Sequence, residues 1–368
     1  MAKRHLQKRS DLPSARQDPP SPASTITRHT FFVGGSYSGP PEARVMQGQM
    51  CVEMLTPEER ARPYPIVLIH GAAQTAINWL TTPDGRKGWA EWFAEHGWQV
   101  CLVDQPARGR SAWQPGLDGA LKPVPVSVIE DLFTAPEDSG IWPQAKRHTQ
   151  WPGGERKGHA GDPVFDQFYA SQVASLANPE SEKLMQTAGA ALLDRIGPAI
   201  LVTHSQAGLF GWLIADVRPQ LVKAIVALEP AGPPYKDAVF HSGTDRPWGL
   251  TTLPLTYDPP VSADSPLEFE QQAQGDAPEL IPCWAQKGKP RRLTNLARIP
   301  VLIVTTEASY HAMYDHCTAR YLSAAGVKTD FVRLAEKGIH GNGHLMMLEK
   351  NNLEIAAFLD AWLRANVG

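Results

Sequence analysis

Short runs of consecutive apolar residues alternate with segments of helical periodicity along most of the chain. The apolar runs occupy residues 65–71, 98–104, 200–203, 223–230, 300–307 and 328–334. Uninterrupted runs of this length are typical of strands buried on both faces in a parallel sheet. Helical spacing is present at 86–96, 179–196, 308–325 and 345–365. This order predicts an α/β fold with a mostly parallel central sheet that helices cover on both faces.

The N-terminal region has a different pattern. Residues 30–33 and 45–55 alternate between apolar and polar positions, which predicts a hairpin or two neighbouring strands. Residues 1–28 are basic and rich in proline and serine, so we expect a disordered tail there and a folded domain over 29–368.

Two long stretches interrupt the alternation of strands and helices. Residues 106–176 and 231–297 are irregular and rich in proline and aromatic side chains. Structureless loops of this length are uncommon in a compact domain, so we expect both insertions to fold as a cap over the domain.

Composition excludes several classes of function. A formal net charge of -3 and 20% charged residues indicate neither a nucleic-acid partner nor an anionic membrane surface.

We find no signal-peptide core in the first 28 residues and no apolar run long enough to span a membrane, which predicts a cytoplasmic protein. The four cysteines form no C-x-x-C pair and indicate no particular disulfide. The sequence does not decide whether the protein forms a homodimer.

The segment Thr203-His-Ser-Gln-Ala-Gly208 contains the strongest candidate for chemistry. An apolar strand precedes Ser205, and small residues followed by a helical pattern come after it. This is the context of the nucleophile elbow G-x-S-x-G, although Thr203 stands at the position of the first glycine. Ser205 is therefore the predicted nucleophile.

A serine nucleophile needs a histidine base and an orienting acid at the same edge of the sheet. His344 follows a glycine-rich loop after the last strand, and we favour it over His340. Two acids end strands: Glu229 after the strand that follows the serine helix, and Glu307 after the next strand. Asp104 and Asp315 are weaker candidates for the acid. The residues alone leave Glu229 and Glu307 both open.

The oxyanion hole requires two backbone donors. Gln206 follows the nucleophile, and Ala72 lies in the His70-Gly71-Ala72-Ala73 turn after the first buried strand. Other chemistries are not indicated, because no dinucleotide-binding G-x-G-x-x-G, no P-loop and no metal-ligand spacing is present. We therefore predict no metal and no cofactor.

Taken together, these motifs resemble the α/β-hydrolase superfamily and, within it, the bacterial esterase-713-like group. The matching stretches are 48–53, 70–75, 104–111, 203–208, 254–260 and, most specifically, Gly-Asn-Gly-His-Leu-Met-Met-Leu-Glu-Lys-Asn at 341–351. The resemblance implies a serine esterase with Ser205 as nucleophile, His344 as base and Glu229 as acid. Some members carry cysteines where this chain has Ala72 and Ala73.

The expected function is hydrolysis of a small-molecule carboxylic ester or lactone through an acyl-enzyme on Ser205. Alternatives are an amide or thioester hydrolase, a cofactor-free lyase or decarboxylase using the same pocket, and a binding protein that lacks catalysis. We expect aromatic side chains of the insertions, in particular Trp142, Trp248 and Tyr257, to line the substrate pocket.

Overall fold

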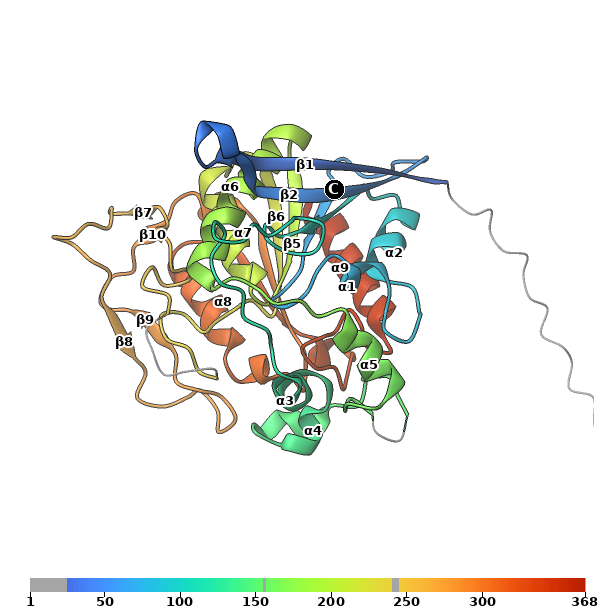
Figure 1. Ribbon diagram of the computed structural model, residues 1–368. Helices are drawn as coiled ribbons and strands as arrows, with labels where there is room; N and C mark the ends of the chain where they lie inside the picture. Colours follow the sequence, from blue (N-terminus) through green and yellow to red (C-terminus); the bar gives the residue numbers. More distant parts are fainter. Residues whose placement is uncertain (1–24, 155–156, 240–244, 368) are drawn as a thin grey trace, which may run out of the picture.

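The computed structural model describes residues 25–154, 157–239 and 245–367 (Figure 1). Its centre is an eight-stranded sheet in the order β1-β2-β4-β3-β5-β6-β11-β12. The strands are β1 (Ile26–Ser38), β2 (Val45–Pro57), β3 (Ile66–Ile69), β4 (Val100–Asp104), β5 (Ala199–His204), β6 (Val222–Leu228), β11 (Val301–Thr305) and β12 (Thr329–Arg333).

Six of these strands run parallel to one another, from β4 to β12 in the spatial order of the sheet. The long hairpin of β1 and β2 adds antiparallel strands at one edge. The predicted α/β-hydrolase fold is therefore confirmed in its mostly parallel sheet. Because parallel strands end at the same edge, the residues that follow β3, β5, β6 and β11 meet there.

Helices cover both faces of the sheet. On one face lie α6 (Asn178–Ile196), α7 (Ala207–Val217) and α8 (Asp315–Ala324); on the other lie α1 (Ile77–Leu80), α2 (Trp89–Glu95) and α9 (Asn352–Val367). Successive side chains of β5 point to opposite faces, so Leu201 packs with the first group and Val202 with the second. None of the helices in the described ranges combines the length and apolar character needed to cross a membrane.

The two insertions lie beyond the sheet. The first contains α3 (Val126–Ile129), η2 (Glu130–Thr134), α4 (Pro136–Ser139), η3 (Pro143–Arg147) and α5 (Pro163–Ala170). The second forms two small sheets, β8 (Phe269–Gln271) with β9 (Trp284–Gln286), and β7 (Tyr257–Asp258) with β10 (Arg292–Leu293). In Figure 1 the first insertion lies below the central sheet, and the second insertion lies beside it. Short 3-10 helices lie in the rest of the chain: η1 (Pro41–Ala43), η4 (Leu296–Arg298), η5 (Tyr310–Met313) and η6 (Leu334–Lys337).

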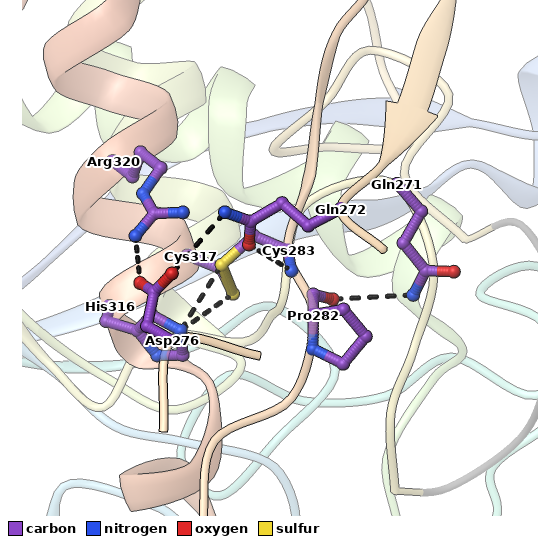
Figure 2. Close-up of a disulfide and its surroundings, with 8 residues drawn as sticks. All are labelled: Gln271, Gln272, Asp276, Pro282, Cys283, His316, Cys317 and Arg320. Carbon is purple, nitrogen blue, oxygen red and sulfur yellow. Dashed lines mark hydrogen bonds and ion pairs between the residues drawn. A yellow bond between two sulfur atoms is a disulfide. The ribbon is translucent and has the colours of Figure 1, made fainter. Parts of the chain in front are cut away.

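A disulfide between Cys283 and Cys317 ties the second insertion to α8 (Figure 2). Nε2 of His316 lies 3.3 Å from Sγ of Cys283, and an ion pair between Arg320 and Asp276 flanks the bridge. The sequence did not indicate this pairing, because the two cysteines are 34 positions apart and have no spacing motif. The other cysteines, Cys51 and Cys101, are buried free thiols.

Three boundaries differ from the sequence-based expectation. β1 begins at Ile26, so residues 26–28 of the expected tail are strand, while residues 1–24 lie outside the described ranges. The last helix begins at Asn352 rather than at 345, because residues 345–351 form turns that follow His344. α6 begins at Asn178 rather than at 179, and the side chain of Asn178 accepts a hydrogen bond from Gln206.

Candidate functional site

Ser205 lies in a sharp turn between β5 and α7. Its φ of 56° is in the left-handed region that L-residues rarely adopt. Hydrogen bonds from its amide to the Leu228 carbonyl (3.0 Å) and from the Ala231 amide to its own carbonyl (2.8 Å) hold this geometry. Gly208 permits the close approach of helix and strand, since a Cβ there would lie 2.4 Å from Cβ of Pro230. The strand, turn and helix have the form of a nucleophile elbow.

His344 and Glu229 form a buried pair beside this turn. Nδ1 of His344 lies 2.6 Å from Oε2 of Glu229, and the two side chains are 2% and 0% exposed. The other carboxylate oxygen of Glu229 accepts from the amide (2.8 Å) and hydroxyl (2.6 Å) of Thr306. Thr306 thus fixes the carboxylate so that Oε2 faces the imidazole. Glu229 itself has a φ of 45°, a second strained backbone position at this edge.

The alternative acid, Glu307, does not contact His344. Its Oε2 accepts from the amide of Gly341 (2.9 Å) and lies 3.2 Å from Nδ1 of His340, which is exposed. Glu307 therefore fastens the start of the loop that carries His344. Of the weaker acids, Asp104 binds Arg110 and Asp315 binds His311, so neither pairs with His344.

Aromatic side chains enclose the imidazole of His344. His311 stacks on it almost in parallel, with ring centroids 4.7 Å apart, and Nε2 of His344 lies 3.4 Å from the Tyr310 hydroxyl. His204 donates from Nε2 to the His344 carbonyl (2.9 Å). Burial, followed by the charge of His311, holds the pKa of His344 well below its ordinary value, so the imidazole is neutral and able to accept a proton.

The hydroxyl of Tyr310 lies beside this imidazole. Burial raises the pKa of Tyr310 well above its ordinary value, the charge of Glu229 adds to this, and a hydrogen bond with Ser205 opposes it. The phenol is therefore neutral, and its contacts connect Ser205 and His344.

A charged clamp holds the loop before His344. Glu349 accepts from the amide of Gly343 (2.9 Å) and from the side chain of Asn342 (2.7 Å). His148, from the first insertion, lies between Glu349 (2.8 Å) and Glu137 (2.6 Å). Burial alone would lower the pKa of His148, but the hydrogen bonds to the two carboxylates outweigh it and raise the pKa to about 9.

Ala72 and Gln206 are the two residues predicted to supply the oxyanion hole. In the described part of the chain, neither backbone amide donates to a protein acceptor. Both residues line one cavity with Ser205. Gly71 packs against the nucleophile turn, because a Cβ at this position would lie 3.0 Å from Cβ of Ser205. Both amides thus remain candidates for the predicted oxyanion hole.

The cavity at Ser205 has a volume of about 270 Å³. Apolar side chains of the first insertion form one wall: Val124, Val128, Ile129 and Phe133. None of the three aromatics expected in the pocket lines it. Trp142 is buried against Tyr310 and donates to the Ala308 carbonyl, while the Tyr257 hydroxyl lies 2.8 Å from that of Tyr321 and donates to the Trp248 carbonyl. These side chains pack the insertions onto the domain.

Two clusters bring metal-binding side chains together among the described residues. In the first, Glu229, His311 and His344, the donor atoms of Glu229 and His311 are engaged by hydrogen bonds to Thr306, His344, Asp315 and Tyr314. The second consists of the disulfide cysteines and His316. The hydrogen bonding of the first cluster suits proton transfer through His344.

Several residues at the site were not recognised in the sequence. Thr306 is the first residue after β11 and directly precedes Glu307, so its position at the sheet edge was a usable signal. Arg108 lies inside the stretch 104–111 that carries part of the resemblance, but its role was not assigned. Tyr310 and His311 fall in a segment expected to be helix, and no local pattern marks them.

Comparisons with known proteins add independent findings. No protein-family model matches the chain. A curated protein from a fungal species (strain ATCC 74256), described as "Probable secreted lipase phiG", is 47% identical over 355 residues, covering 95% of this chain and 93% of its own length. Among solved structures, one described as a novel bacterial esterase superposes with a TM-score of 0.60 at 26% identity, over 95% of this chain and all of that one.

The expected cytoplasmic location is wrong. The fungal relative, which matches nearly the whole chain, is described as secreted. The disulfide between Cys283 and Cys317 agrees with an oxidising compartment, where such bonds form and persist.

The identity to the fungal protein extends over almost all of both chains, and the bacterial esterase superposes over 95% of this chain. This chain therefore belongs to the α/β-hydrolase esterase group.

Proposed function

We propose that the protein is a secreted serine hydrolase that cleaves carboxylic esters through an acyl-enzyme on Ser205. The observation that carries the proposal is the buried pair of His344 and Glu229, joined over 2.6 Å beside a serine held at a φ of 56°. The descriptions of its relatives as an esterase and a lipase support ester hydrolysis. The disulfide and the secreted relative support export.

In the first half of the reaction, Nε2 of His344 removes the proton from the Ser205 hydroxyl as Oγ attacks the carbonyl carbon. The Nδ1–H of His344 points at Glu229, whose negative charge stabilises the imidazolium that forms. The carbonyl oxygen becomes an oxyanion, which the amides of Ala72 and Gln206 bind. When the tetrahedral intermediate collapses, the C–O bond breaks and His344 returns its proton to the leaving alkoxide.

In the second half, a water molecule attacks the acyl-enzyme. His344 takes a proton from the water, the oxyanion forms again in the same hole, and the carboxylic acid leaves as Ser205 recovers its proton. A lactone would follow the same steps, except that the alkoxide released by ring opening is part of the acyl group, so water releases a single hydroxy acid from Ser205.

The cavity supports substrates of modest size. Its volume of about 270 Å³ and the apolar wall of the first insertion fit a short or branched acyl or alcohol group. We therefore propose soluble esters or lactones, rather than emulsified long-chain triglycerides, as preferred substrates.

A panel of soluble esters, lactones and emulsified triglycerides tests the proposal with wild type, Ser205→Ala, His344→Ala and His340→Ala. The last is a matched control, because His340 lies in the same loop but is exposed and does not contact Glu229. We expect hydrolysis of soluble esters to fall about 10⁴-fold or more in the first two variants and by less than about threefold in the third. Equal activity in wild type and Ser205→Ala would refute the acyl-enzyme, and faster turnover of long-chain emulsions would refute the substrate class.

A further inference from the structure

Arg108 connects the two sides of the oxyanion hole. Its Nη1 donates to the carbonyl of Gly71 (2.9 Å), and its Nη2 donates to Oε1 of Gln206 (2.7 Å). The side chain is buried, at 4% exposure. One guanidinium therefore contacts both the turn after β3 and the residue after the nucleophile.

These contacts act on the donors of the proposed hole. The carbonyl of Gly71 and the amide N–H of Ala72 belong to the same planar peptide, so a hydrogen bond that fixes the carbonyl also fixes the direction of the N–H. On the other side, the Gln206 side chain is held between Arg108 and Asn178, to which its Nε2 donates (2.8 Å). This restrains the residue whose backbone supplies the second donor.

A second hydrogen bond strengthens the effect at Gly71. Nδ1 of His70 lies 3.0 Å from the same carbonyl, and Nε2 of His70 accepts from the amide of Gln105 (3.2 Å). Burial lowers the pKa of His70 to about 3, so the ring is neutral and donates from Nδ1. Two donors on one carbonyl polarise the peptide, which makes the Ala72 N–H a stronger donor.

The charge of Arg108 has no carboxylate partner among the residues that the structure describes. Arg110, two positions along, binds both Glu53 (2.6 Å) and Asp104 (2.8 Å). An unpaired buried cation lowers stability. A negative charge that develops on the substrate oxygen during the reaction would offset this cost, and preorganised charges of this kind are typical of sites that stabilise an oxyanion.

We propose that Arg108 is a positioning residue that aligns the Ala72 and Gln206 amides and stabilises the oxyanion through its charge. It touches neither Ser205 nor His344 in any hydrogen bond of the described residues and transfers no proton. The inference rests on the proposed acyl-enzyme mechanism, since it assigns a role within that oxyanion hole.

Steady-state kinetics of Arg108→Met and Arg108→Lys on a soluble ester test the role, with Arg110→Met as the matched control in the same loop. We expect kcat to fall about 10²-fold in Arg108→Met with KM changed less than about twofold, since the hole acts on the transition state. Arg108→Lys keeps the charge but not the two-pronged contact, so its kcat is expected to lie between that of Arg108→Met and that of the wild type. Arg110→Met is expected to keep kcat within about threefold of wild type, because the contacts of Arg110 are to Glu53 and Asp104 rather than to Gly71 or Gln206.

A transition-state analogue gives an independent readout. A trifluoromethyl ketone forms a hemiketal oxyanion on an activated serine, so its inhibition constant is expected to rise across the Arg108 variants in proportion to the loss of kcat/KM. Near-UV circular dichroism establishes that each variant is folded. A kcat for Arg108→Met within about threefold of wild type, or equal losses in the Arg108 and Arg110 variants, would overturn the inference.

Labelling of the wild type with a fluorophosphonate separates the two proposals. If Ser205 is labelled and Arg108→Met keeps its kcat, only the role of Arg108 is refuted. If Ser205 of the folded wild type is not labelled, the acyl-enzyme mechanism fails and the role of Arg108 fails with it.

Discussion

Nδ1 of His344 lies 2.6 Å from Oε2 of Glu229, and neither side chain has more than 2% of its surface exposed. The carboxylate stays in this orientation because its second oxygen is held by the amide and hydroxyl of Thr306. The pair therefore has one geometry, in which Nε2 of the imidazole lies 3.4 Å from the Tyr310 hydroxyl. An acid and a base arranged in this way activate a serine.

This relationship predicts which glutamate is the acid. Glu229→Gln removes the charge that stabilises the His344 imidazolium, so we expect kcat to fall by about 10³-fold to 10⁴-fold. Glu307→Gln is the matched control, because an amide oxygen can still accept from Gly341. It is expected to keep kcat within about tenfold of wild type. The reverse order of effects would assign the acid to Glu307.

The environment of His344 predicts activity in mildly acidic solution. The base must be unprotonated, and burial together with His311 lowers the pKa of His344. The acid limb of kcat/KM is therefore expected below pH 6.5, the ordinary value for histidine. In His311→Asn the limb is expected to move to higher pH, whereas Tyr314→Phe, which changes only a hydrogen-bond partner of His311, should leave it in place. An acid limb above pH 6.5 in the wild type would contradict this assignment of the base.

The clamp around His148 predicts a pH-dependent stability. The folded-state pKa of about 9 exceeds the ordinary value of 6.5, so the stabilisation is complete below pH 6.5 and is lost as the pH rises through 9. We expect the free energy of unfolding to fall by about 3 kcal/mol over that window, and urea titrations measure it. His148→Gln should flatten the dependence. His159→Gln, in the same insertion but partly exposed, should not; equal flattening in both variants would exclude the clamp as the cause.

The disulfide predicts how the second insertion is stabilised. Cys283 and Cys317 close a loop of 34 positions, and opening such a loop costs about 3 to 4 kcal/mol. We expect the Tm of the wild type to fall when dithiothreitol is present. The double variant Cys283→Ala, Cys317→Ala is expected to have a Tm below that of the oxidised wild type, and this Tm should be the same with and without reductant. A double variant whose Tm still falls in dithiothreitol would show that another bond is responsible.

Much of the fold could be predicted from the sequence, because buried parallel strands leave uninterrupted apolar runs. The same pattern located Ser205 and Glu229 at strand ends. The choice between Glu229 and Glu307 could not be made from strand positions alone, since β6 and β11 are neighbours and both glutamates follow them. The contacts that pair Glu229, and not Glu307, with His344 are displayed only by the folded chain.

The insertions were the least predictable part. Trp142, Trp248 and Tyr257 are large and aromatic, but each is placed by packing between segments that are distant in sequence. The cavity wall is formed instead by small apolar residues such as Val124 and Val128. The contacts of Arg108 could not be predicted for a similar reason, because its partners Gly71 and Gln206 lie 37 and 98 positions away in the sequence.

Activation of Ser205 by His344 is the central claim. Intact-mass and peptide mapping after treatment with a fluorophosphonate tests it most directly, in wild type and in His344→Ala. We predict a single adduct, located on Ser205, that is lost in His344→Ala. An unmodified Ser205 in the folded wild type, or an adduct that forms equally fast without His344, would contradict the claim.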